Sequence, residues 1–263
     1  MEWQVTLAGS RIDVERLFRE LPLEVEAIPD DATHVLVSLT NPEGEATGDD
    51  VGHAAKRAID ALVARLNGLG RLRWGRAFEG VAVASIQSTN VGGATTTYVF
   101  PAAIDAHFSY EELIRFADAQ GLPQPPAPRG LAHIRSLELS EVNRLAQEDP
   151  DVARALRLVD LAFAQPEHLD WTMAYCALEV VEEDAKSRGL DGPSLGWWSK
   201  TERENFRATA NSPNALGVRA RHGKRSGVAE PRMNEMEAAW YVRRVVARWL
   251  AYRLKLETTA SST

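Results

Sequence analysis

Residues 170–182 have the sequence Asp170-Trp-Thr-Met-Ala-Tyr-Cys-Ala-Leu-Glu-Val-Val-Glu182, and they indicate how the C-terminal half of the chain folds. Their apolar side chains recur every three or four residues, which predicts an amphipathic helix over 171–187. Asp170 can accept hydrogen bonds from the free N–H groups at the helix start, and Gly189 can end the helix in a left-handed conformation. The side chains that we expect to face the core are Met173, Cys176, Ala177, Val180 and Val181.

Further helices are predicted on both sides of this one, and short links join them. Five of the seven tryptophans lie in this half of the chain, and we interpret most of them as core anchors. The pattern predicts an all-helical bundle over residues 131–263. Leu161 and Met236 belong to the apolar stripes expected to be buried. Ser140 is predicted to cap the first of the other helices, and Asn234 is predicted to cap the last. Between them, one helix is predicted to have Pro150 at its first position, and another to begin at Lys200.

The N-terminal half mixes strands with helices. Because the two do not alternate strictly, we predict an α+β domain over residues 1–122 rather than a doubly wound sheet. Asn67-Gly68 is predicted to end one helix, and residues 90–93 are predicted to connect a hairpin. Periodicity predicts strands over 3–7, 23–28, 34–39, 70–78, 80–87 and 95–100, a turn-rich loop over 41–50, and helices over 12–21, 51–67 and 110–120.

Proline marks the boundary between these halves. Four prolines lie within residues 123–128, where they can neither continue a helix nor sit in a central strand. We therefore predict a stiff, extended connector over 123–130 and place a domain boundary there. The alternative is a long surface loop within a single domain.

Composition and charge limit the classes of function. The 263 residues carry 30 Lys and Arg against 37 Asp and Glu, a net charge of −7, which argues against a general nucleic-acid binder. The charge is unevenly distributed, however: residues 1–198 sum to −14 and residues 199–263 to +7. A local contact with an anionic partner is therefore still open.

The chain contains no apolar run near the roughly 20 residues that a membrane helix needs, and it opens without a secretory signal. We therefore expect a cytoplasmic protein with no membrane contact. The single Cys176 excludes an internal disulfide and a cysteine-based zinc cluster. The six histidines lack metal-ligand spacing, so we expect neither a metal nor a cofactor.

A basic stretch before the last predicted helix is the most informative candidate site. Residues 199–225 hold seven Lys and Arg and two Glu. Within it, Arg219, Arg221 and His222 lie within four residues. Arginine can hold a phosphate with a planar fork of donors, and histidine can carry a proton near neutral pH, so these three are the candidate catalytic residues. The candidate phosphate-binding residues are Arg207, Asn211, Lys224 and Arg225.

The alternative interpretation of this stretch is a solvated basic loop, whose arginines pair with the acidic stretch from Glu179 to Asp184.

A separate motif is Gly192-Pro-Ser-Leu-Gly196, which matches the G-x-S-x-G pattern of a hydrolase nucleophile elbow. That elbow needs a strand before the serine, whereas a helix is predicted here, so we favour a loop between two helices.

The C-terminal half resembles the HEPN superfamily over roughly residues 138–256. The likeness rests on residues 170–182, on the bundle behind a β-rich N-terminal region as in ApeA-like proteins, and on an Arg/His cluster before the last long helix. Active members are metal-independent RNases with an Arg, a polar residue, four to six further residues and a His, often paired across a two-fold dimer. Here Arg219 precedes His222 by three residues and is followed by Ala220.

This resemblance implies Arg219 or Arg221 as the phosphate-binding arginine and His222 as the motif histidine. It further implies an RNA-directed protein that dimerises through its bundle, and a metal-independent endoribonuclease of a bacterial defence or toxin type. The rival hypothesis is a non-catalytic interaction and dimerisation module whose N-terminal domain binds a ligand or partner.

Overall fold

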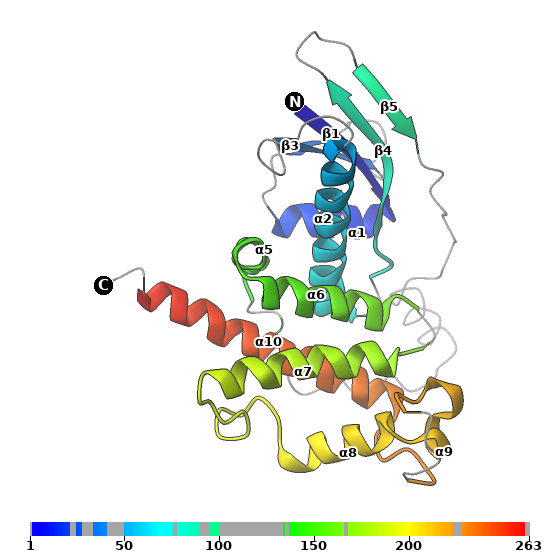
Figure 1. Ribbon diagram of the computed structural model, residues 1–263, viewed down its shortest axis with the longest axis vertical. Coiled ribbons are helices and arrows are strands. Elements are labelled where there is room, and N and C mark those ends of the chain that lie inside the picture. Colours follow the sequence, from blue (N-terminus) through cyan, green and yellow to red (C-terminus); the bar gives the residue numbers. More distant parts are fainter. Residues whose placement is uncertain are drawn as a thin grey trace, which may run out of the picture.

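The protein is an α+β protein in which an antiparallel sheet with its helices leads into a stack of helices (Figure 1). The architecture is taken from a computed structural model. Figure 1 places the sheet at one end of the molecule and helices α8 and α9 at the other. The structure describes residues 2–21, 25–27, 34–40, 50–75, 78–89, 95–99, 134, 137–165, 168–222 and 228–260.

The N-terminal half forms a sheet of strand order β2-β3-β1-β4-β5, in which every neighbouring pair is antiparallel. In register, Val5 of β1 lies opposite Val37 of β3 and Ile86 of β4. The first six elements follow the β-α-β-β-α-β order of a split β-α-β unit, and β5 extends one edge. The elements are β1 (Glu2–Gly9), α1 (Arg11–Glu20), β2 (Val25–Ala27), β3 (His34–Thr40), α2 (Asp50–Trp74), β4 (Val81–Thr89) and β5 (Thr95–Val99).

Most of the predicted N-terminal elements are confirmed. The predicted strands at 3–7, 34–39, 80–87 and 95–100 and the helix at 12–21 are present, and β2 is the described part of the strand predicted at 23–28. The Ser10 hydroxyl accepts a hydrogen bond from the Asp13 N–H and caps α1. The loop over 41–49, the hairpin connection 90–93, the helix over 110–120 and the connector over 123–130 lie outside the described residues.

The end of α2 differs from the prediction. The helix does not stop at Asn67-Gly68 but continues to Trp74, so the predicted strand over 70–78 is wrong. A Cβ atom built on Gly68 would lie 2.3 Å from the backbone oxygen of Leu156, and one on Gly70 would lie 2.4 Å from the Phe78 ring. The missing side chains of these glycines let neighbouring elements pack closely against α2. The stabilisation from this packing outweighs the low helix propensity of glycine.

The C-terminal half is helical, as predicted. Asp149 and Asp170 cap their helices through their carboxylates, and Pro150 occupies a first helical position. Ser199 and Glu202 form a capping box at the start of α8. Gly189 has a positive φ just after the end of α7. The elements are α5 (Leu139–Glu148), α6 (Pro150–Phe163), α7 (Trp171–Ser187), α8 (Lys200–Ala210), α9 (Pro213–Leu216), the 3-10 turn η2 (Gly217–Arg219) and α10 (Glu235–Ala260).

Three local predictions in this half are wrong. The N-cap position of α5 is Glu138 rather than Ser140, and it makes no side-chain capping bond. Leu161 is 44% exposed and Met236 is 53% exposed, although both were expected in the core. Each lies near a helix end, where the apolar stripe runs past the surface that its neighbours cover.

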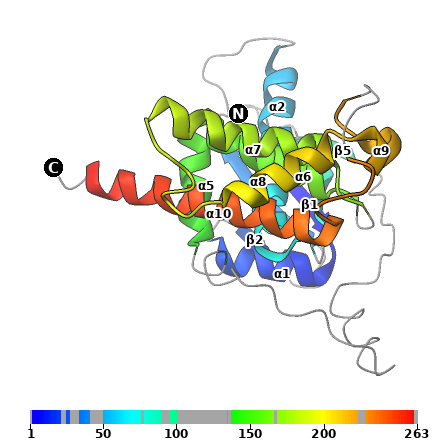
Figure 2. The ribbon, with the colours of Figure 1, turned by 90° about the horizontal axis from the view of Figure 1, so that it is seen from below.

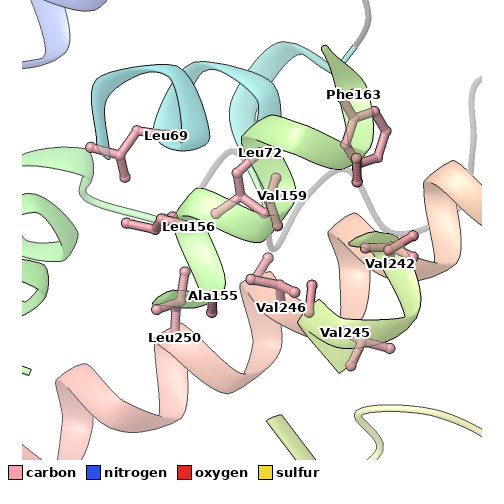
Figure 3. Close-up of a cluster of buried hydrophobic side chains, with 14 of the residues drawn as sticks. Leu69, Leu72, Ala155, Leu156, Val159, Phe163, Val242, Val245, Val246 and Leu250 are labelled. Atoms are coloured by element: carbon pink, nitrogen blue, oxygen red, sulfur yellow. The ribbon is translucent and has the colours of Figure 1, made fainter. Parts of the chain in front are cut away.

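One hydrophobic core joins the two halves of the protein. Figure 3 shows α6 between α2 and α10, with Leu69 and Leu72 on one side of it and Val246 and Leu250 on the other. Arg243 of α10 strengthens this contact, because its Nε donates to the Leu72 carbonyl at 2.9 Å and its Nη2 to the Arg73 carbonyl at 2.7 Å. The guanidinium therefore caps the free carbonyls at the end of α2.

Helix α8 completes the stack at the end away from the sheet. Figure 2 shows it lying against α7 and α10. Arg203 of α8 pairs with Glu182 of α7, and Arg244 of α10 pairs with Glu202 of α8 at 2.6 Å. Across the part of the chain that the structure describes, none of the helices combines the length and apolar character needed to cross a membrane.

Candidate functional site

The candidate site lies on the segment between α8 and α10, and two buried hydroxyl groups hold the base of this segment. Ser212 Oγ donates to the Val228 carbonyl at 2.6 Å. Thr209 Oγ1 accepts from the backbone N–H groups of Arg232 at 2.9 Å and Met233 at 3.2 Å. The residues on either side of 213–227, a stretch that we call the basic loop, are therefore joined to each other.

The basic loop concentrates positive charge. By sequence it contains Arg219, Arg221, Lys224 and Arg225 together with His222, and it contains no Asp or Glu. Its first part, through α9 and η2 to His222, is described by the structure. Lys224 and Arg225, two of the candidate phosphate-binding residues, lie outside the described residues.

Arg221 is held on three sides. Its Nη2 donates to both carboxylate oxygens of Glu179, at 3.0 and 3.3 Å. The guanidinium lies over the Tyr175 ring, 3.9 Å from its centroid, which is a cation–π contact. The backbone N–H donates to the Ala210 carbonyl at 2.9 Å. The pairing of Arg221 with Glu179 is the arrangement that the alternative of a solvated, ion-paired loop required.

Arg219 points to a different carboxylate. It forms an ion pair with Glu235 in the first turn of α10, and its Nη1 lies 3.5 Å from His168 Nδ1. Glu235 also accepts a hydrogen bond from the Leu169 N–H at 3.4 Å. Arg219 and Arg221 are therefore each directed at a separate carboxylate, rather than at a common position where one phosphate could sit.

The other candidate residues contribute less. His222 is exposed, and its Nε2 lies 3.5 Å from Arg221 Nη1. Arg207 is exposed, with its guanidinium 6.0 Å from the Tyr175 ring centroid. Asn211 ends α8, and its side-chain oxygen is buried with no hydrogen-bond partner in the described part of the chain.

This geometry limits the chemistry that the cluster can perform. Cleavage of a phosphodiester needs a proton-transfer group and a cationic donor around one reacting phosphate. Here the two arginines donate to different carboxylates, Arg219 to Glu235 and Arg221 to Glu179. In this arrangement the cluster fixes the loop on α7 and α10.

The chain shows no significant match to any protein-family model, curated protein or solved structure.

The G-x-S-x-G segment does not form a nucleophile elbow. Ser194 lies in a run of turns between α7 and α8, and its hydroxyl donates to the Asp191 carboxylate. The residue before this segment follows a helix and not a strand, as the sequence indicated. Among the described residues, no three His, Cys, Asp or Glu side chains come together in a way that could hold a metal ion.

A buried polar network around Asp184 was missed in the sequence, where this residue counted only as part of an acidic stretch. Asp184 is 7% exposed, and its carboxylate accepts from Trp249 Nε1 at 2.8 Å and from Arg253 Nη1 at 2.9 Å. Arg253 also pairs with Asp149, the cap of α6. The network ties α7, α10 and the start of α6 together. Its only sequence signal is an acidic residue at an inward position of the α7 stripe.

A second group of buried charges lies where α2 meets α6. Burial raises the pKa of Asp160 to about 6, against the opposing effect of the nearby Arg71 and Arg157. Arg71 is itself buried, and its guanidinium donates to the carbonyls of Phe78 and Glu79. Asp13 accepts from the N–H groups of Glu79 and Gly80 at 2.7 and 3.3 Å. Arg71 and Asp13 hold the turn after α2 in place, and none of these three groups lies on the basic loop.

Proposed function

We propose that this protein is a non-catalytic, HEPN-like interaction module that contacts the RNA backbone through its basic loop. The observation that carries the proposal is the basic loop itself, which is closed at its base by Ser212 and Thr209 and carries four Lys and Arg without an acidic residue. A compact concentration of positive charge on an otherwise acidic chain favours a local, anionic partner.

The choice of binding over cleavage rests on the two arginines. Glu179 and Glu235 engage Arg221 and Arg219, and His222 is exposed beside Arg221 alone. A metal-independent endoribonuclease of a defence or toxin type, the other function that the HEPN resemblance implies, would need these groups to converge on one phosphate.

The organisation that fits this function has an N-terminal domain over residues 1–122, a connector over 123–130 and a bundle over 131–263. The N-terminal domain would bind a further partner or ligand, and the bundle would form a homodimer. One observation supports assembly through the bundle. The bundle half exposes five large apolar side chains, which assembly would cover: Leu161, Leu195, Val218, Met236 and Leu256.

The proposal predicts how salt affects RNA binding. Replacing Lys224 and Arg225 together by alanine should weaken binding of a single-stranded RNA, because two phosphate contacts are lost. The slope of log K against log salt should fall by about 1.4, since each contact on a single strand contributes about 0.7. The measurement is fluorescence anisotropy of a labelled RNA at a series of salt concentrations.

The matched control removes two positive charges elsewhere. Arg154 and Lys186 are exposed on α6 and α7, outside the basic loop. Replacing both by alanine should leave the slope close to that of the wild-type protein. Equal slopes for the loop variant and the wild type would contradict RNA contact through the basic loop.

A further inference from the structure

Both described arginines of the basic loop already hold an anion, and each anion is a side chain of this chain. We infer that Glu179 and Glu235 compete with RNA phosphates for Arg221 and Arg219, and so hold these two arginines in an autoinhibited state. The inference rests on the proposed function and specifies how the same site is regulated.

The contacts of Arg221 commit one nitrogen and one face of its guanidinium. Nη2 of the guanidinium donates to both carboxylate oxygens of Glu179, and one face of the group lies on the Tyr175 ring. An arginine fork holds a carboxylate or a phosphate in closely similar geometry. An RNA phosphate would therefore have to replace Glu179 to gain the same hydrogen bonds.

Arg219, on the other side of Ala220 in the sequence, is also paired with a carboxylate of the same chain. It donates to Glu235, which also accepts from the Leu169 backbone. Glu235 lies in the first turn of α10, where the helix dipole favours a negative charge. Loss of Arg219 to a phosphate would therefore leave Glu235 with its other stabilising contacts.

The exposure of these pairs makes exchange feasible. Glu179 is 45% exposed and Arg219 is 42% exposed, so water already reaches both pairs. Exposed ion pairs contribute little to stability. A ligand with several linked phosphates can therefore displace both carboxylates, whereas a single phosphate gains little over them.

The test replaces both glutamates by glutamine, which preserves their shape. The control replaces Glu183 and Glu230, exposed residues on α7 and before α10, in the same way. Both double variants remove two negative charges, so they change the net charge equally. Binding of a labelled single-stranded RNA is measured by anisotropy in EDTA at one salt concentration.

We expect E179Q/E235Q to bind about five-fold tighter than E183Q/E230Q, as follows from releasing two exposed ion pairs. Tighter binding by E179Q/E235Q than by both the wild type and E183Q/E230Q would support the inference. Equal affinities of the two double variants, with binding by the wild type, would overturn the autoinhibition and leave the proposed function standing. Absence of binding in every variant would overturn both.

Discussion

Replacing Asp184 by alanine should lower the free energy of unfolding by about 3–5 kcal/mol, the cost of breaking a buried ion pair on one side. The carboxylate accepts hydrogen bonds from Trp249 and Arg253, and the side chain of Arg253 is only 9% exposed. The variant leaves a buried guanidinium with one carboxylate fewer and a buried indole N–H without its acceptor. Urea denaturation followed by circular dichroism measures the loss.

The neighbouring Glu183 is the matched control for this prediction. It is exposed on the same helix, so Glu183→Ala should change the stability by no more than about 0.5 kcal/mol. If Asp184→Ala costs less than about 1 kcal/mol, the polar network does not join α7 to α10 as described.

Replacing Gly68 by alanine should destabilise the protein by about 1–3 kcal/mol, the usual cost of overpacking a tight interior contact. The added methyl group would meet the backbone of Leu156 at 2.3 Å, and a backbone contact cannot be relieved by a change of rotamer. Helix propensity alone predicts the opposite sign, a gain of about 1 kcal/mol. The sign of the change in urea denaturation therefore decides between the two.

Ala61 provides the control on the same helix. It is exposed on α2, so Ala61→Gly should cost about 1 kcal/mol through propensity alone. A gain in stability for Gly68→Ala would contradict the close packing of α2 on α6. It would thereby also contradict the contact through which the sheet half and the bundle share one core.

The helix ends of this protein show what local sequence patterns can and cannot predict. The cap at Asp170, the first helical position of Pro150 and the end of α7 at Gly189 were predicted correctly, because helix starts and ends depend on residues only a few positions apart. Gly68 was interpreted by the same local rules and gave a wrong helix end. Its role depends on Leu156, 88 positions away along the chain, and no local pattern contains that contact.

In the candidate site, too, one contact was suggested by the sequence and others depend on the tertiary structure. The acidic stretch that begins at Glu179 suggested a partner for the arginines, and Arg221 does pair with Glu179. Glu235 as the partner of Arg219 was not predicted, because it depends on where α10 begins relative to η2. The hydrogen bonds that Thr209 accepts from the backbone before α10 were not predicted either. A single hydroxyl in a polar helix gives no sequence pattern that would indicate such a contact.

The central claim is that the basic loop binds RNA without cleaving it. The most direct test incubates a labelled single-stranded RNA with the protein in EDTA, measures anisotropy, and then runs the same samples on a denaturing gel. We predict saturable binding by the wild type and intact RNA at the end of the incubation. Cleavage by the wild-type protein that His222→Ala abolishes would contradict this account and favour the endoribonuclease.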